Sequence, residues 1–253
     1  MKNAMKLRRT FTKKDIFIIF GCIVFLLMNI RAISGSGRRR AKEMVCLSNL
    51  RQWGSVFQMH IESNDGYFIS GTGNTSYWWI KQLDDRYKDW KSMRIWFCPT
   101  AKRPTFDENG VMTPSLNIFN AWGIFYGEGH GPNGAAGSYG LNGYLIGQKF
   151  EGRNNVPVFV DALRFDLWPQ ETEPPTAYEF AAWSSNNMAR CCINRHNGAI
   201  NTLFADWSSR KIGLKQLWTL NWHSQFDTKG PWTIASGVQP SDWPEWMRNF
   251  SDY

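Results

Sequence analysis

The sequence predicts an α+β protein, with a long membrane-anchored N-terminal helix followed by a loop-rich antiparallel β domain. Three observations lead to this fold class. Eleven of the fifteen residues in the run Ile16–Ile30 are Ile, Leu, Val or Phe. Apolar residues then recur at three-to-four spacing from Met44 to Ile61, which is typical of an amphipathic helix. Beyond Tyr67, short β-type runs alternate with stretches rich in Gly and Pro.

Basic residues are concentrated at the start of the 253-residue chain. Residues 1–42 carry eleven Lys and Arg and one acid, whereas residues 43–253 carry 18 bases and 20 acids. A duplex-binding surface needs clustered positive charge, so the bulk of the chain is not expected to bind nucleic acid. The bases instead flank the apolar run, as they do in membrane proteins. We therefore expect contact with membrane lipid.

The first 33 residues divide into a basic leader, 1–15, and an expected transmembrane helix, 16–33. Three interpretations of this region stay open. It is a cleaved secretory signal with Ala32-Ile33-Ser34 at the cleavage site, a permanent anchor, or a processed leader. All three place residues 43–253 outside the cytoplasm.

The remainder divides into a linker with an amphipathic helix, 34–66, and an extracytoplasmic β-rich domain, 67–253. Gly35 and Gly37 are expected to break the helix, because each Gly costs a helix roughly 1 kcal/mol relative to Ala. Asn64-Asp65-Gly66 predicts the end of the amphipathic helix. Two strands are expected, at Val156–Val160 and at Ile200–Ala205.

The start of the chain resembles a type IV prepilin, in which a basic leader ends in Gly and Phe-Thr-Leu-Ile-Glu follows. Phe11 and Thr12 match that pattern, and Asp15 lies where the family has Glu. Thr10 replaces the Gly, and Lys13-Lys14 replace apolar residues. The resemblance implies processing after Thr10 and pairing of Asp15 with the N-terminal amine of a neighbouring subunit.

Further segments resemble a bacterial pseudopilin-like family named after an H-X9-DG motif, whose members are called prepilin-type processing-associated proteins. His196 and Asp206 have the spacing of that motif, and Trp207 replaces its Gly. The other similar segments are Cys46–Gln52, Asn64–Phe68, Phe97-Cys98-Pro99, Ser138–Gly143, Val156–Asp161, Gly213–Trp218 and Trp243–Met247.

The resemblance implies a non-enzymatic, pilin-like or pseudopilin-like protein. It would be a minor or accessory subunit of a type IV pilus or type II secretion-like apparatus. The partners implied are other pilin-like subunits and secretion or pilus assembly proteins. The implied location is the inner membrane, crossed once, with a periplasmic or extracytoplasmic C-terminal domain.

His196 and Asp206 are not expected to form a catalytic pair. An extended chain rises about 3.3 Å per residue, so their side chains would lie up to roughly 30 Å apart. A dyad needs hydrogen-bond contact. Asp206 is instead expected to begin a turn into Ser208, although Trp207 tolerates a positive φ poorly.

Four cysteines lie beyond the apolar run: Cys46, Cys98, Cys191 and Cys192. A bond between the adjacent Cys191 and Cys192 is strained, so one hypothesis joins Cys46 and Cys98 each to one of them. Free buried thiols are the alternative. A zinc site of Cys191, Cys192 and His196 matches no usual finger spacing. No metal site is therefore predicted.

Two other functions are alternatives to assembly. Fourteen tryptophans, including Trp78-Trp79 and Trp243 with Trp246, would suit a membrane-anchored glycan-binding protein, which is the main alternative. Glu171 and Glu173 could serve a hydrolase, but such a Pro-bounded pair is more often solvated surface. No cofactor is expected, although Asp107-Glu108-Asn109-Gly110 could hold calcium, which is known among pseudopilins.

Overall fold

The computed structural model describes residues 12–68, 79–103, 105–106, 112–113, 119–125, 134–180 and 186–253. It divides into two compact units, Met1–Ala41 and Lys42–Tyr253. The leader residues Thr10 and Phe11, the loop Asp107–Gly110 and Trp78 lie outside the described residues. The predictions made for them therefore have no structural counterpart here.

The described residues form an α+β structure. Helix α1 covers Lys13–Glu62, and the other α-helices are short: α2 (Trp79–Gln82), α3 (Asp85–Lys88) and α4 (Asn187–Cys191). The strands are β1 (Tyr67–Phe68), β2 (Thr105–Phe106), β3 (Met112–Thr113), β4 (Trp122–Phe125), β5 (Ala135–Gly137), β6 (Tyr139–Asn142), β7 (Gln148–Lys149), β8 (Pro157–Asp161), β9 (Asp166–Leu167), β10 (Ala199–Phe204) and β11 (Ser209–Gly213).

The prediction of a membrane-spanning helix was wrong. Within the described ranges, no helix combines the length and the apolar character that crossing a bilayer requires. The physical reason is visible in the sequence: the fifteen-residue run Ile16–Ile30 rises about 22 Å as a helix, against a hydrocarbon core of about 30 Å. This finding overturns the membrane-anchored fold class, the transmembrane segment 16–33 and the single-pass inner-membrane location.

The start of α1 is fixed by a reciprocal cap. The Thr12 backbone N–H donates to Asp15 Oδ2 at 2.9 Å, and the Asp15 N–H donates to Thr12 Oγ1 at 3.3 Å. These contacts satisfy two of the N–H groups that a helix start leaves without partners. The expected break at Gly35 and Gly37 is absent, because α1 is continuous through both residues.

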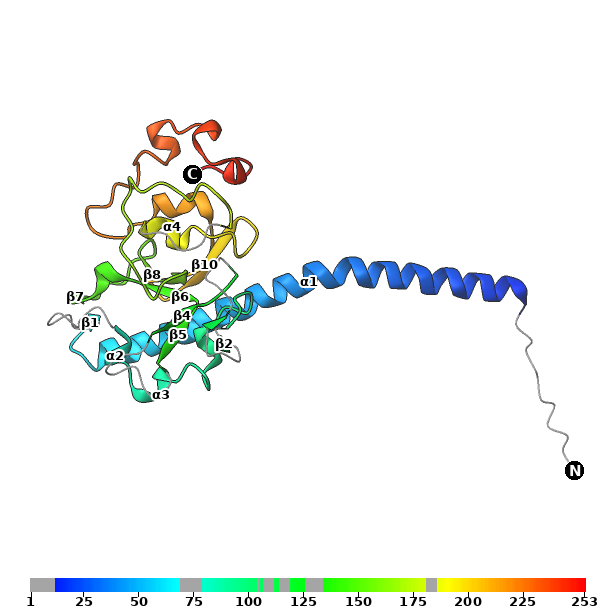
Figure 1. Cartoon of the computed structure of the whole chain (residues 1–253), viewed down its shortest axis with the longest axis horizontal. Coiled ribbons are helices and arrows are strands. Elements are labelled where there is room, and N and C mark those ends of the chain that lie inside the picture. The colour runs from blue at the N-terminus through cyan, green and yellow to red at the C-terminus, as the bar shows by residue number, and fades with distance from the viewer. Residues whose placement is uncertain are drawn as a thin grey trace, which may run out of the picture. The chain divides into compact units, whose positions relative to one another are not determined.

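The second unit is built on a five-stranded sheet in the order β11-β10-β8-β6-β9. Strands β10, β8 and β6 of this sheet are labelled in Figure 1. Its neighbours are antiparallel except β6 and β9, which are parallel. Three two-stranded ribbons join β1 to β7, β2 to β3 and β4 to β5. Every residue of β8 and β10 is buried, so both faces of these strands are covered.

Two apolar clusters lie on the two faces of this sheet. The first holds Phe159 and Leu203 of the sheet together with Trp53 and Phe57 of α1. The second holds Val160 and Phe204, the next residues along the same strands. Successive side chains of a strand point to opposite faces, which explains this division.

Aromatic rings dominate the first cluster. The Trp53 ring lies 4.8 Å from that of Trp96 and 5.3 Å from that of Phe159, centroid to centroid, both in edge-on geometry. Such pairs add about 0.5–1.5 kcal/mol beyond their buried area. This packing fixes the segment of α1 after Lys42 against the sheet and so positions Cys46.

Candidate functional site

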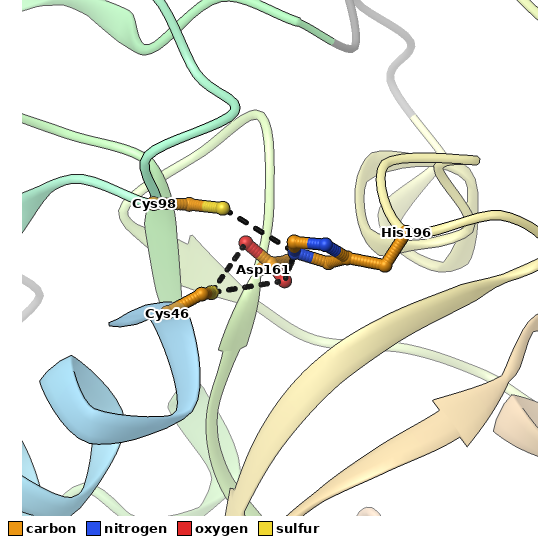
Figure 2. A group of neighbouring side chains, drawn as sticks. All are labelled: Cys46, Cys98, Asp161 and His196. Carbon is orange, nitrogen blue, oxygen red and sulfur yellow. Dashed lines mark hydrogen bonds and ion pairs between the residues drawn. The ribbon is translucent and has the colours of Figure 1, made fainter. Parts of the chain in front are cut away.

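Four chemically reactive side chains meet at the end of strand β8. Cys46 comes from α1, Cys98 from the turn after the 3-10 helix η1 (Arg94–Trp96), Asp161 from the last position of β8, and His196 from the loop before β10 (Figure 2). One ligand atom of each lies within 4.8 Å of those of the others. These four residues form the buried cluster.

The buried cluster is closed to solvent. Cys46, Cys98 and Asp161 are 0% exposed, and His196 is 4% exposed. The His196 Nε2 lies 3.0 Å from Asp161 Oδ2 and 3.3 Å from Cys98 Sγ. The Cys46 thiol faces both carboxylate oxygens of Asp161 at 3.7 Å.

The negative charge of a carboxylate buried this deeply must be balanced by nearby hydrogen-bond donors or positive charges. Arg195, the Asn201 backbone N–H and His196 supply them. Arg195 Nη1 donates to Asp161 Oδ1 at 3.1 Å, and the Asn201 backbone N–H donates to Oδ2 at 2.9 Å. Burial alone would raise the pKa of Asp161. The charges of His196 and Arg195 outweigh it and lower that pKa to about 2. Asp161 is therefore ionised.

The pKa values of the histidine and of both cysteines are shifted by burial and by their neighbours in the cluster. Burial tends to lower the pKa of His196, but the adjacent carboxylate of Asp161 raises it to about 10. Burial tends to raise the pKa of Cys98, but its contacts with Cys46 and His196 lower it. The pKa of Cys46 is raised, chiefly by burial. The carboxylate of Asp161 therefore favours the protonated form of His196.

The geometry differs from that of a Cys-His-Asp catalytic triad. In a triad the nucleophile and the acid contact different ring nitrogens of the histidine. Here Cys98 and Asp161 both face the same atom, Nε2 of His196. The ring therefore cannot pass a proton between them in the manner of a triad, and burial leaves no opening for a substrate.

The motif residues His196 and Asp206 lie apart and have different structural roles. His196 belongs to the buried cluster, whereas Asp206 is exposed and accepts the Ser208 backbone N–H at 2.9 Å. Trp207 adopts a positive φ of 64°, so this turn has a left-handed residue at the position where the H-X9-DG motif that it resembles has Gly. Asp15, expected to pair with another subunit, holds the cap of α1 described above.

The cysteines do not pair as the disulfide hypothesis expected. All five are free. Cys191 and Cys192 lie in the second apolar cluster, where the Cys191 thiol contacts the Met188 carbonyl at 3.3 Å. Cys46 belongs to the first apolar cluster, on the other face of the sheet, as does Cys98. The zinc set of Cys191, Cys192 and His196 is not brought together either.

The residues suggested for glycan binding and for hydrolysis have structural contacts instead. Among the described residues no tryptophan is exposed, and Trp79 and Trp243, two candidates for a glycan platform, are 0% and 1% exposed. The Glu173 carboxylate accepts the backbone N–H groups of Asn187 and Met188 at 3.0 and 2.9 Å. It therefore caps helix α4.

Sequence reasoning missed Asp161 and Arg195 as site residues. The available signal was that Cys46, Cys98, Asp161 and His196 each lie in one of the segments that carry the family resemblance. Comparison of the chain with family models, with curated proteins and with solved structures found no match. The family resemblance therefore stays an expectation.

Proposed function

We propose that this protein is a non-enzymatic assembly subunit that packs the N-terminal part of α1 against the helices of other pilin-like chains. The observation that carries the proposal is an exposed apolar segment at the start of α1. Its large hydrophobic residues, between 46% and 81% exposed, are Ile16, Phe17, Ile18, Ile19, Phe20, Ile23, Phe25, Leu26 and Leu27. We call these nine residues the apolar segment.

The distribution of these side chains supports a helical partner. They follow one another so closely that they occupy all sides of the helix rather than one stripe. Contiguous apolar surface of this kind marks an interaction site in a folded protein. Apolar helices that approach from several sides would cover it, as they do in a bundle of packed helices.

The charges at the start of α1 favour a minor or accessory subunit. Lys13 and Lys14 are both exposed and directly precede the apolar segment. Side-by-side copies of this chain in register would place these like charges together, which is unfavourable. A partner with a different helix start avoids that repulsion. The resemblance to type IV pilins and type II secretion pseudopilins points to partners of that kind.

Site-specific photocrosslinking of the full chain in its native cells tests the proposal. A photoreactive residue replaces Phe17, which is 81% exposed, or Tyr178, an aromatic residue of the second unit that is 77% exposed. We expect crosslinks from position 17 to chains that themselves begin with an apolar helix, and none from position 178. The absence of crosslinks at position 17, or the same partners at both positions, would refute the proposal.

Charge substitutions give a second measurement. Phe17→Glu combined with Phe20→Glu is expected to abolish co-purification with the crosslinked partners, because burying two carboxylates between apolar helices is costly. Tyr178→Glu is the matched control and should leave the complex intact. Both variants should keep the melting temperature of the second unit, since these residues lie outside its apolar clusters.

A further inference from the structure

We propose that the buried cluster is a structural zinc site, with Cys46, Cys98, Asp161 and His196 as its four ligands. This inference goes beyond the proposed function and does not depend on it. It rests on the convergence of four donor groups from separate segments on one point (Figure 2).

The donor set fits zinc by its chemistry. Zn²⁺ in proteins is bound by thiolate sulfur, imidazole nitrogen and carboxylate oxygen, and four-coordinate sites are the rule for structural zinc. Two thiolates are a poor match for Ca²⁺ or Mg²⁺, which take oxygen ligands. The cluster supplies two sulfurs, one nitrogen and one carboxylate.

Three of the six distances between donor atoms are close to the edges of a zinc tetrahedron. Bonds of about 2.3 Å to sulfur and about 2.0 Å to nitrogen or oxygen give edges of about 3.3–3.8 Å. The Cys46–Asp161 contact is 3.7 Å, the Cys98–His196 contact is 3.3 Å and the His196–Asp161 contact is 3.0 Å. The other donor pairs lie within 4.8 Å of one another, so shifts of about an ångström or less would admit the ion.

The charges of the surroundings match a divalent cation. With both cysteines as thiolates, Asp161 as carboxylate and His196 neutral, the ligands carry three negative charges. Arg195, whose side chain is 0% exposed, adds one positive charge through its contact with Asp161. The remaining charge of minus two is what Zn²⁺ neutralises. A neutral total is the arrangement that a fully buried site requires.

Groups around the ligands are placed to orient them. Tyr139 donates its hydroxyl to Cys46 Sγ at 3.2 Å, and Thr100 Oγ1 lies 2.8 Å from Cys98 Sγ. The side-chain amide of Asn201 is fully buried and makes no hydrogen bond with the residues that the structure describes. A metal-bound thiolate would give this amide an acceptor, as outer groups do at metal sites.

The arrangement points to a structural rather than a catalytic role for the ion. All four positions are filled by protein side chains, whereas catalytic zinc keeps one position open for water or substrate. The ligands lie on α1, the turn after η1, the end of β8 and the loop before β10. Zinc would therefore join four segments of the second unit at one point.

Metal reconstitution of the reduced full chain tests the proposal. The probes are Zn²⁺ and Co²⁺, added to metal-free protein with a phosphine reductant present. We expect one equivalent to bind, and the Co²⁺ form to show the visible bands of tetrahedral cobalt together with thiolate-to-cobalt charge transfer. Zn²⁺ should also raise the melting temperature of the wild-type protein, and a chelator should reverse that rise.

Cysteine variants assign the ligands. Cys46→Ser and Cys98→Ser should each lose the charge-transfer intensity and at least tenfold in zinc affinity. Cys192→Ser, a substitution of another buried free thiol, and Cys22→Ser, of an exposed one, are the matched controls and should bind like wild type. Should the serine variants at 46 and 98 fail to fold, the wild-type stoichiometry and cobalt spectrum decide the question.

Three results would overturn the proposal. One is a folded, reduced wild-type protein that takes up no stoichiometric zinc. Another is an octahedral Co²⁺ spectrum without charge transfer from sulfur. The third is a Cys46–Cys98 disulfide in the native protein that resists reduction until the chain unfolds.

Discussion

Replacing Trp207 by Gly is expected to destabilise the protein, although it restores the glycine of the motif turn. The backbone of Trp207 has a φ of 64°, a left-handed conformation that costs a non-glycine residue about 1–2 kcal/mol. Gly would remove that strain. The question is whether the indole ring contributes more than the strain takes away.

The contacts of the Trp207 ring decide whether the substitution stabilises or destabilises the protein. The indole stacks on Phe150 with centroids 4.7 Å apart and planes inclined by 14°, and it also lies against Gly54 of α1. A largely buried indole removes on the order of 100–150 Å² of apolar surface from water, which stabilises by about 2.5–4 kcal/mol. Stacking adds about 0.5–1.5 kcal/mol. We therefore expect Trp207→Gly to lower the free energy of unfolding by about 2–3 kcal/mol.

Urea unfolding followed by circular dichroism measures this difference, with Phe150→Ala and the double variant completing a thermodynamic cycle. The cycle should show a coupling of about 1 kcal/mol between the two rings. A Trp207→Gly variant as stable as wild type, or more stable, would refute the reasoning. In that case the strained turn, and not the ring, would govern the energy at this position.

Three further predictions concern the surroundings of the buried cluster. Arg195→Ala should destabilise by about 3–5 kcal/mol in urea unfolding, because it leaves the buried Asp161 carboxylate uncompensated; a loss below about 1 kcal/mol would contradict this. In chelator, the unfolding free energy should be greatest between about pH 4 and pH 6.5. The pKa of His196 is about 10 in the folded protein against 6.5 unfolded, so its contribution to the unfolding free energy is lost as the pH rises from 6.5 towards 10. The pKa of Asp161 is about 2 in the folded protein against 3.8 unfolded, so its contribution is lost as the pH falls from 3.8 towards 2. A flat pH profile would show that the ion pair is not formed. Gly140→Ala would place a methyl group 2.5 Å from the Arg164 backbone oxygen, so we expect a loss of more than about 2 kcal/mol in the same assay. A neutral result would mean that the loop carrying Arg164 can move aside.

Local patterns predicted the local elements well. The runs Val156–Val160 and Ile200–Ala205 coincide closely with β8 and β10. The amphipathic spacing up to Ile61 ends where α1 ends, at Glu62. These elements follow from side-chain periodicity, which depends on near neighbours in the chain.

The features that depend on distant partners were missed. Asp161 ends an apolar strand, and no residue near it in the sequence predicts its contacts with Arg195 and His196. The interpretation of Ile16–Ile30 as a membrane helix failed because apolar composition was weighed more heavily than length. At Gly35 and Gly37 the intrinsic cost of glycine did not break the helix.

The separation of the cluster residues along the chain has a consequence for how the protein folds. Cys46 and Asp161 are 115 residues apart, and Cys98 and His196 are 98 apart. Closing loops of this length is entropically unfavourable until other contacts hold the ends together. We therefore expect these four side chains to meet late, after the sheet has formed around them. A chain still emerging from the ribosome would carry Cys46 and Cys98 unprotected until the second half of the polypeptide has been made.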